Sequence, residues 1–402
     1  MEFNHDELSA PGWLNDQFFQ QVLCEYERGV AVRLVGTCEL RPGTKAGDHF
    51  ASVMYRTTIH YRVGSAEKSF NLIMKIKPVS EGLKKDLLDD DDFFGKEIRM
   101  YTRVLPEIAR LMESIGEEYK YPNLIFASQK PHTIIILKDV SPQGWTMKGL
   151  LKSFKEMQPT IDAIAKFHAA SVVMQENDPD FTSLYRCTIA ETLRSMRSMT
   201  DACFDSFVRF VRDILQAPEL VEPVVKFHQR IDDSLRAAYA TTDACTNVLI
   251  HGDFHFKNLL HLQSGNEIVE TMFVDYQMCS WSSQVVDLFY LTYMIPEQSV
   301  KTTHRDAIIH RYYHKFSSVL RRLNYGGHIP SLTELHAEML RKGELELYHY
   351  IVFSAFRYTD LSKVDSEAFF LGRIENPALQ LEEFKVTMRT ELQRFLHQGI
   401  ID

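Results

Sequence analysis

Three polar residues interrupt an otherwise apolar stretch of the sequence: Asp253, Asn258 and Asp275. Burying unpaired carboxylates costs free energy, so two of them beside an amide in apolar surroundings require a compensating partner. A Mg²⁺ ion is one such partner, because it prefers oxygen ligands and usually takes one or two carboxylates together with substrate phosphates. These residue types therefore indicate a metal-assisted reaction at a phosphate group.

The spacing of these residues narrows the chemistry. The segment from His251 to Asn258 reads His-x-Asp-x-x-x-x-Asn, which is the pattern of a kinase catalytic loop. In such loops the Asp accepts the proton of the substrate hydroxyl, the Asn holds Mg²⁺, and a second Asp on the next strand holds the bridging Mg²⁺. We therefore predict that Asp253, Asn258 and Asp275 are catalytic and that Asn258 and Asp275 are the metal ligands. An acidic hairpin turn with a capping Asn is the alternative, and two motifs in the right order weaken it.

Phosphoryl transfer also needs a cation on the nucleotide phosphates, oriented by a carboxylate from a helix. Lys75 stands near the end of a predicted strand, and Glu97 lies on the predicted helix that follows, 22 residues further on. Lys77 is a rival, because a period of two places it on the same face of the strand. We prefer Lys75, since three apolar residues precede it directly, whereas Lys77 abuts Pro78 at the strand exit.

A loop that covers the phosphates should lie between the first two predicted strands. Residues 43–52 are the only candidate, and backbone N–H groups around Gly47 and Ser52 could bind phosphate; an ordinary loop is at least as good an interpretation. His255 occupies the place where protein kinases carry a phosphate-contacting Lys, so we expect a supporting contact to the γ-phosphate. His168 is predicted to be a satisfied core histidine, and Asp287 to brace the catalytic loop.

The elements that must position these residues form two patterns. Residues 48–63 and 69–77 alternate in the manner of a β-hairpin, with a turn at Gly64-Ser65, and residues 133–137 predict a short buried strand. Apolar residues at helical spacing follow residue 93, and helical periods dominate from residue 150 onward, interrupted only at 247–275. We predict an α+β fold with a small antiparallel β lobe carrying one helix (1–140, nucleotide-binding) and a larger, mainly helical lobe (141–402, catalytic and substrate-binding).

Composition limits the function classes. The chain has 402 residues and a formal net charge of −9, which argues against a dedicated nucleic-acid partner. No stretch is long and apolar enough to span a membrane, and the N-terminus has no signal-peptide pattern. The six cysteines form no Cys-x-x-Cys pair, which is typical of a reduced compartment. We therefore expect a cytoplasmic protein, a monomer or weak dimer, without a membrane or nucleic-acid partner.

The order of the motifs resembles the ecdysteroid kinase-like (CHK kinase-like) family, within the choline-kinase and aminoglycoside-phosphotransferase group of protein-kinase-like folds. The resemblance covers roughly residues 30–360. It is carried by Gly47-Asp48, Ser52, Tyr55-Arg56, Lys75, Phe94-x-x-Glu97-Ile98-x-x-Tyr101, Ile136-Leu137-x-Asp139, Phe167-His168-Ala169-Ala170-Ser171, His251 to Asn258, Phe273 to Gln277 and Asp287-Leu288.

The resemblance implies a protein-kinase-like bilobal fold that uses ATP and Mg²⁺ to phosphorylate a small-molecule hydroxyl, with ecdysteroids as the best-known acceptors. It also places Asp139 in the linker that contacts adenine. Lys138 stands there in place of the family's frequent Glu. Because hinge contacts are mostly made by backbone groups, we expect ATP binding to survive this change.

Three other functions remain as alternatives. One is a catalytically silent, kinase-like binding protein, although all five expected polar residues are present. Another is a choline- or aminoglycoside-type kinase, because the preference for an ecdysteroid or another apolar hydroxylated compound comes from the resemblance alone. A metal-dependent phosphohydrolase would share the acidic ligands but would not need Lys75 and Glu97. A protein kinase is disfavoured, because only 11 residues separate Asp275 from Asp287, too few for an activation loop.

Overall fold

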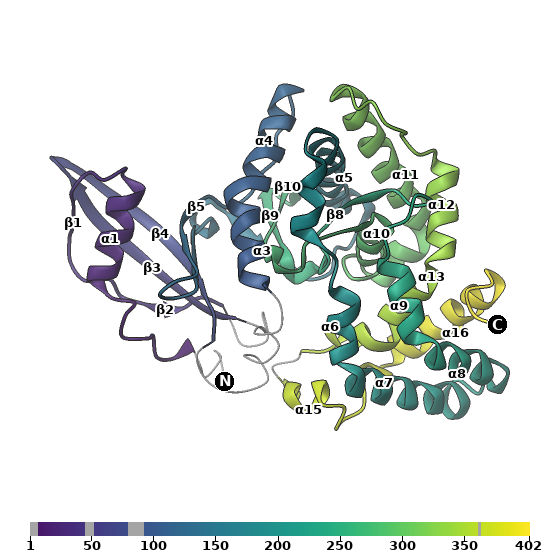
Figure 1. Ribbon diagram of the computed structural model, residues 1–402. Coiled ribbons are helices and arrows are strands. Elements are labelled where there is room, and N and C mark those ends of the chain that lie inside the picture. Colours follow the sequence, from purple (N-terminus) through teal and green to yellow (C-terminus); the bar gives the residue numbers. More distant parts are fainter. Residues whose placement is uncertain (1–6, 45–51, 79–91, 361–362) are drawn as a thin grey trace. The chain divides into compact units, whose positions relative to one another are not determined.

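The computed structural model describes residues 7–44, 52–78, 92–360 and 363–402 (Figure 1). Contacts group the chain into two compact units. The sheet unit consists of Met1–Arg110, Glu118–Lys148 and Lys257–Gln277, and the helical unit consists of Leu111–Glu117, Gly149–Phe256 and Met278–Asp402. The α+β composition predicted from the sequence is confirmed, since one unit carries the main sheet and the other is mainly helical.

The main sheet is six-stranded and antiparallel, with the order β1-β3-β4-β6-β5 and β2 paired to β3. Its central hairpin joins β3 and β4 through Gly64-Ser65, because Val63 pairs with Ala66, as the alternating pattern predicts. Gly64 has a φ of +61°, which a side chain would disfavour. The strands are β1 (Val32–Leu34), β2 (Arg41–Pro42), β3 (Val53–Val63), β4 (Ala66–Ile76), β5 (Leu124–Ser128) and β6 (Ile134–Lys138).

One face of this sheet packs against α1 (Asp16–Tyr26), a helix that the sequence analysis did not predict. Burial alternates along β3, so Tyr55, Ile59 and Tyr61 point into the core. Phe19 and Leu23 of α1 belong to the same apolar cluster. The apolar face of α1 is only two turns long, which gives a weak periodic signal compared with the strands.

A second helical segment in the sheet unit begins at α3 (Phe93–Arg99), whose N-terminus is capped by Asp92. It continues through a π-helical turn (η2, Met100–Val104) into α4 (Leu105–Ser114). Pro106 lies two residues after the π turn and has no N–H to donate, so the regular ladder of i to i−4 hydrogen bonds is interrupted there. The hydrogen-bond register of the helix therefore changes at this point. Glu97 lies before it, on α3.

A small sheet completes the sheet unit and holds two of the predicted site residues. Its order is β10-β9-β7, formed by β7 (Trp145–Met147), β9 (Leu259–Ser264) and β10 (Glu267–Phe273). Asn258 directly precedes β9, within a short 3-10 turn (Phe256–Asn258), and Asp275 follows β10. Because β7 pairs with β9, these contacts do not divide the chain at a single point near residue 140, where the sequence analysis places the boundary.

The helical unit is built around α5 (Phe154–Asn177) and α11 (Gln298–Arg322), which pack along one another. Its two-stranded sheet pairs β8 (Asn247–Ile250) with β11 (Ser280–Ser283), so the apolar run at 248–250 does not join the hairpin formed by β9 and β10. The remaining elements are α6 (Ile189–Ser195), α7 (Arg197–Arg209), α8 (Val221–Gln229), α9 (Ile231–Tyr239), α10 (Val285–Tyr293), α12 (Leu332–Arg341), α13 (Gly343–Tyr348), α14 (Ser354–Tyr358), α15 (Ser366–Phe370) and α16 (Glu382–His397), with π turns at Phe210–Ile214 and His349–Phe353 and 3-10 turns at Pro179–Tyr185, Pro218–Leu220 and Pro377–Gln380.

Within the residues that the structure describes, none of the helices combines the length and the hydropathy that a bilayer crossing requires.

Candidate functional site

The ε-amino group of Lys75 is the centre of a buried polar group in the sheet unit. Its Nζ donates to Glu97 Oε2 at 2.6 Å, to Asp275 Oδ1 at 2.5 Å and to Gln277 Oε1 at 3.3 Å. The other oxygen of Glu97 accepts the backbone N–H of Tyr276 at 3.3 Å. Glu97 therefore ties the lysine from strand β4 to the turn that carries Asp275.

Burial and nearby charges shift the pKa values of Lys75 and Glu97 in opposite directions. Burial alone would lower the pKa of Lys75, but the carboxylates of Asp275 and Glu97 hold it above its usual range. Burial raises the pKa of Glu97, and the Lys75 ammonium opposes that shift. Lys75 thus stays protonated at physiological pH and presents a fixed positive charge.

This charge lies at the wall of a cavity of about 730 Å³. The main sheet contributes apolar side chains, among them Ile73 and Leu137. Leu260 comes from the small sheet, and Val274 directly follows β10. Small-molecule sites typically measure 300–1,000 Å³ and combine apolar walls with a few polar groups. The cavity therefore has the size and the character of a site for an aromatic base with a charged tail.

The predicted metal ligands line the same cavity. Asn258 is buried and Asp275 is partly exposed, and the backbone N–H of Val274 donates to the carbonyl of Asn258 at 3.1 Å, which holds the two segments together. Asp275 has a φ of +64°, a left-handed conformation that is uncommon outside glycine and concentrates at functional sites.

No three of the described His, Cys, Asp and Glu residues form a preassembled metal cluster. Mg²⁺ does not require one, because it usually takes one or two protein oxygens and completes its shell with phosphate and water. The oxygen donors of Asn258 and Asp275 fit this requirement. Their role as ligands stays a prediction.

Three further predicted residues concern the nucleotide. Ser52 is buried at the edge of the cavity, whereas Gly47 lies outside the described residues. Asp139 also lines the cavity, but its carboxylate accepts from Arg56 Nη1 at 3.0 Å and from the backbone N–H of Ser141 at 2.9 Å. The side chain of Asp139 is therefore occupied in shaping the cavity wall.

Asp253 belongs to the helical unit, where its surroundings are tightly built. Gly252 has a φ of +81°, and an added Cβ would lie 2.5 Å from the carbonyl oxygen of Met278, so only glycine fits before Asp253. His255 Nε2 lies 3.3 Å from Asp253 Oδ1. The histidine that we predicted to contact a phosphate is thus in contact with the predicted base.

Asp287 braces this loop, as predicted. Its carboxylate accepts the backbone N–H groups of His251 at 2.7 Å and Gly252 at 3.0 Å. His168, also predicted to be a satisfied core residue, is fully buried and joins Asp287 at 3.0 Å to Tyr312 at 2.7 Å. The loop before Asp253 is therefore fixed by a buried hydrogen-bond network.

The Asp253 carboxylate acts electrostatically on buried aromatic side chains of the helical unit. Burial raises the pKa values of Tyr239 and Tyr290 well above their usual range, and the Asp253 carboxylate adds to both shifts. Burial lowers the pKa of His349 to about 3, which nearby carboxylates, Glu346 first and then Asp253, oppose. The ring of Tyr290 lies 4.4 Å from that of His349.

Two residues of the site, Arg56 and Gln277, were not predicted from the sequence. Arg56 donates to the carbonyl of Gly43 at 2.7 Å as well as to Asp139, and Gln277 contacts Lys75. Both stand inside motifs that we quoted, but nothing in their spacing distinguishes them from surface residues. A charged residue on an interior strand such as β3 was the one available signal for Arg56.

A search of curated proteins finds no match. The chain is similar to solved structures of choline kinase from Cryptosporidium parvum Iowa II (12% identity, 90% of this chain and 91% of that chain, TM-score 0.44), a choline/ethanolamine kinase family protein from Mesorhizobium loti (14%, 95% and 98%, TM-score 0.39) and wild-type aminoglycoside 2′-phosphotransferase-IIIa in its GDP complex (12%, 82% and 97%, TM-score 0.36).

The model of the ecdysteroid kinase-like family matches residues 46–325, well over half of the 402 residues. The matched range contains every residue that we assigned to the site, including the Lys75–Glu97 pair and the Asp253 loop. The chain therefore belongs to the ecdysteroid kinase-like family.

Proposed function

We propose that this protein is an ATP- and Mg²⁺-dependent kinase of small molecules, which transfers the γ-phosphoryl group to a hydroxyl of an ecdysteroid or another apolar alcohol. The observation that carries the proposal is the position of Lys75, which stands between Glu97 and Asp275 at the wall of the 730 Å³ cavity. A cation held by a helix carboxylate beside a metal-binding Asp is the arrangement that phosphoryl transfer needs.

In this proposal the nucleotide base lies between the apolar walls of the cavity, and Lys75 contacts its phosphates. Mg²⁺, when bound by Asn258 and Asp275, would neutralise the charge that develops on the phosphates. Asp253 accepts the proton of the acceptor hydroxyl as the oxygen–phosphorus bond forms and the bond to the ADP oxygen breaks. The contact with His255 orients the Asp253 carboxylate.

Membership in the ecdysteroid kinase-like family supports an apolar acceptor. Tyr239, Tyr290 and His349 are buried and stay uncharged near neutral pH, because burial shifts each pKa away from that range. Their uncharged state is compatible with an uncharged hydroxylated ring system as the acceptor. They would suit a cationic acceptor such as choline only through cation–π contacts.

The test is transfer of ³²P from labelled ATP to a panel of one ecdysteroid, other sterols, choline, an aminoglycoside and a generic peptide. We expect labelling of the ecdysteroid or another sterol, dependent on Mg²⁺. Asp253→Asn should keep nucleotide affinity and lower turnover by several orders of magnitude. Nucleotide binding without labelling of any acceptor would favour the silent binding protein, and labelling of choline or the aminoglycoside alone would defeat the assignment of an apolar acceptor.

A further inference from the structure

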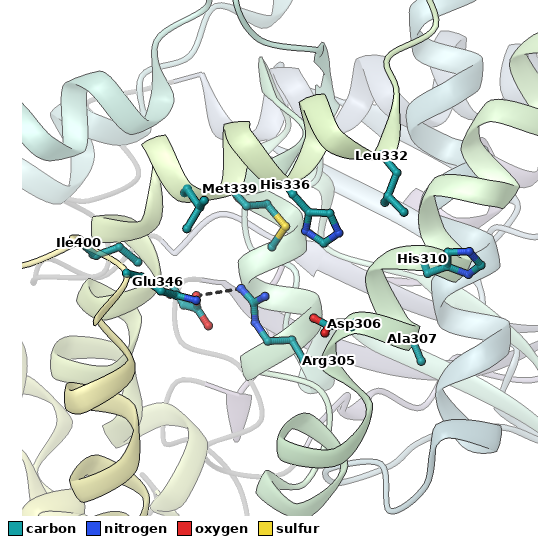
Figure 2. A pocket seen from close by; sticks show the side chains of 11 residues that line it. Arg305, Asp306, Ala307, His310, Leu332, His336, Met339, Glu346 and Ile400 are labelled. Carbon is teal, nitrogen blue, oxygen red and sulfur yellow. Dashed lines mark hydrogen bonds and ion pairs between the residues drawn. The ribbon is translucent and has the colours of Figure 1, made fainter. Parts of the chain in front are cut away.

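A second cavity, of about 590 Å³, lies entirely within the helical unit (Figure 2). Side chains from α11, α12, α13 and the chain after α16 line it. Its volume is within the range that small-molecule sites occupy. None of the residues to which we assigned a role in phosphoryl transfer lines it.

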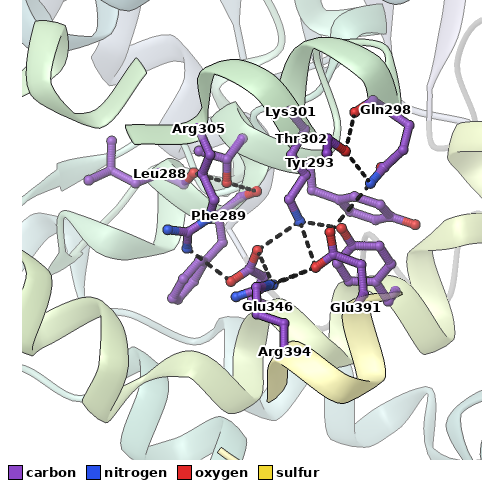
Figure 3. Close-up of polar contacts among 12 residues, drawn as sticks. Leu288, Phe289, Tyr293, Gln298, Lys301, Thr302, Arg305, Glu346, Glu391 and Arg394 are labelled. Carbon is purple, nitrogen blue, oxygen red and sulfur yellow. Dashed lines mark hydrogen bonds and ion pairs between the residues drawn. The ribbon is translucent and has the colours of Figure 1, made fainter. Parts of the chain in front are cut away.

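Two residues that line this cavity, Arg305 and Glu346, belong to a buried ion group (Figure 3). Glu346 is almost fully buried and pairs with Lys301 at 2.8 Å, Arg305 at 3.2 Å and Arg394 at 2.9 Å. Burial alone would raise the pKa of Glu346, but these three cations hold it well below its usual range. Glu391 pairs with Arg394 at 2.7 Å and with Lys301 at 3.6 Å.

The charges in this group do not balance. Three cations, Lys301, Arg305 and Arg394, share the two carboxylates of Glu346 and Glu391. Burial lowers the pKa of Lys301, which reduces the excess of positive charge. Arg305 is the least compensated of the three cations, because Lys301 and Arg394 each contact both carboxylates and Arg305 contacts only Glu346.

Arg305 also has unused hydrogen-bond donors. Its guanidinium carries five N–H groups, of which Nη2 donates to Glu346. The buried Nε has no hydrogen-bond partner among the described residues and is not accessible to a ligand, whereas Nη1 is accessible and makes no hydrogen bond with another described residue. Since Arg305 lines the cavity, an acceptor bound there could take hydrogen bonds from Nη1.

The rest of the wall is mainly apolar and carries a few polar groups. Leu332, Met339 and Ile400 supply an apolar surface, and His336, which makes no hydrogen bond with another described residue, stands on α12 among them. Asp306 lines the same cavity and is exposed to solvent, and its charge opposes an anion. The wall thus combines Arg305 and its free Nη1 donors with the carboxylates of Glu346 and Asp306 and an apolar face.

From these contacts we propose that the cavity binds a small amphipathic anion, such as a carboxylate or a phosphate monoester with a short apolar body. The anionic group accepts hydrogen bonds from Arg305 and His336, and the body lies against Leu332, Met339 and Ile400. The proposal does not depend on the kinase activity, because it uses none of the residues assigned to phosphoryl transfer.

Calorimetric titration of the full chain tests this, with octanoate and octyl phosphate as probes and octanol and octylammonium as controls with the same apolar body. We expect saturable binding of an anionic probe only, and the two anions distinguish a carboxylate ligand from a phosphate ester. Arg305→Gln should weaken binding about tenfold or more, as loss of a hydrogen bond to a charged group does. Asp306→Asn should strengthen it, since the opposing charge is removed. Asp253→Asn should leave binding unchanged, which separates this cavity from the acceptor site.

Arg305→Gln also removes a partner of buried Glu346 and could disturb folding, so a pair of rim variants provides a second measurement. Leu340 lines the cavity and is 51% exposed, so charges are tolerated there. Leu340→Glu should weaken binding of the anionic probe, and Leu340→Lys should preserve or strengthen it. The proposal is overturned if no anion binds saturably, if octanol or octylammonium binds equally well, or if the two Leu340 variants bind the anion alike.

Discussion

Replacing Lys75 by Met tests the buried polar group of the sheet unit most directly. The side chains of Lys75 and Glu97 are 8% and 3% exposed and their charged atoms lie 2.6 Å apart. The substitution removes the cation and leaves the Glu97 carboxylate buried without its partner. Loss of one member of a buried ion pair costs about 3–5 kcal/mol, and we expect the local free energy of unfolding to fall by about that amount.

A second substitution separates stability from binding. Lys75→Met combined with Glu97→Gln removes the stranded charge, so most of the lost stability should return. Nucleotide affinity should stay low in both variants, because neither has a cation for the phosphates. Lys77→Met is the matched control: Lys77 lies beyond the end of β4 and is half-buried, so we expect a change below about 1 kcal/mol and normal nucleotide affinity.

Native-state hydrogen exchange of amides in β4 and α3 is the suitable assay, because a chain with two compact units has no single free energy of unfolding. Nucleotide affinity is measured in parallel by calorimetry. If these amides exchange as slowly in Lys75→Met as in the wild type, the buried ion pair does not stabilise the sheet unit as we infer. A double variant that is no more stable than the single one would refute the same inference. Damage from Lys77→Met with a silent Lys75→Met would show that the other lysine contacts the phosphates.

Three further outcomes follow from the described contacts. Asp287→Ala leaves the amides of the loop before Asp253 without their buried acceptor, so the exchange of the Gly252 amide should accelerate at least about tenfold; unchanged exchange would contradict the bracing role. Arg56→Lys cannot span the carbonyl and carboxylate that the guanidinium joins, so nucleotide affinity should fall if Asp139 shapes the cavity, and calorimetry measures this. Hydrogen bonds from nearby lysines outweigh burial and lower the pKa of Glu117 from 4.5 to about 2, so its stabilising contribution is complete above pH 4.5 and is lost as the pH falls toward 2. Glu117→Gln should flatten that part of the acid-denaturation curve, and an unchanged curve would argue against the shift.

The sequence by itself determined the features that depend on short-range patterns. Alternation over a few residues predicts the β3–β4 hairpin and its Gly64-Ser65 turn, because side chains on a strand repeat every two residues. Motif spacing predicts the pairing of Lys75 with Glu97, and this ion pair forms in the structure. The order of the motifs also predicted the family, which the match to the family model confirms.

Only the tertiary structure decided which distant segments meet. No periodic pattern in the sequence predicts three of these contacts. They are the pairing of β8 with β11, the contact of Lys75 with Asp275 across 200 positions and the contact of Arg56 with Asp139 across 83 positions. The unbalanced charge at Arg305 likewise exists only because α11, α13 and α16 come together. Such contacts arise from the packing of whole elements, which depends on the complete shape of each buried face and not on the spacing of residues along the chain.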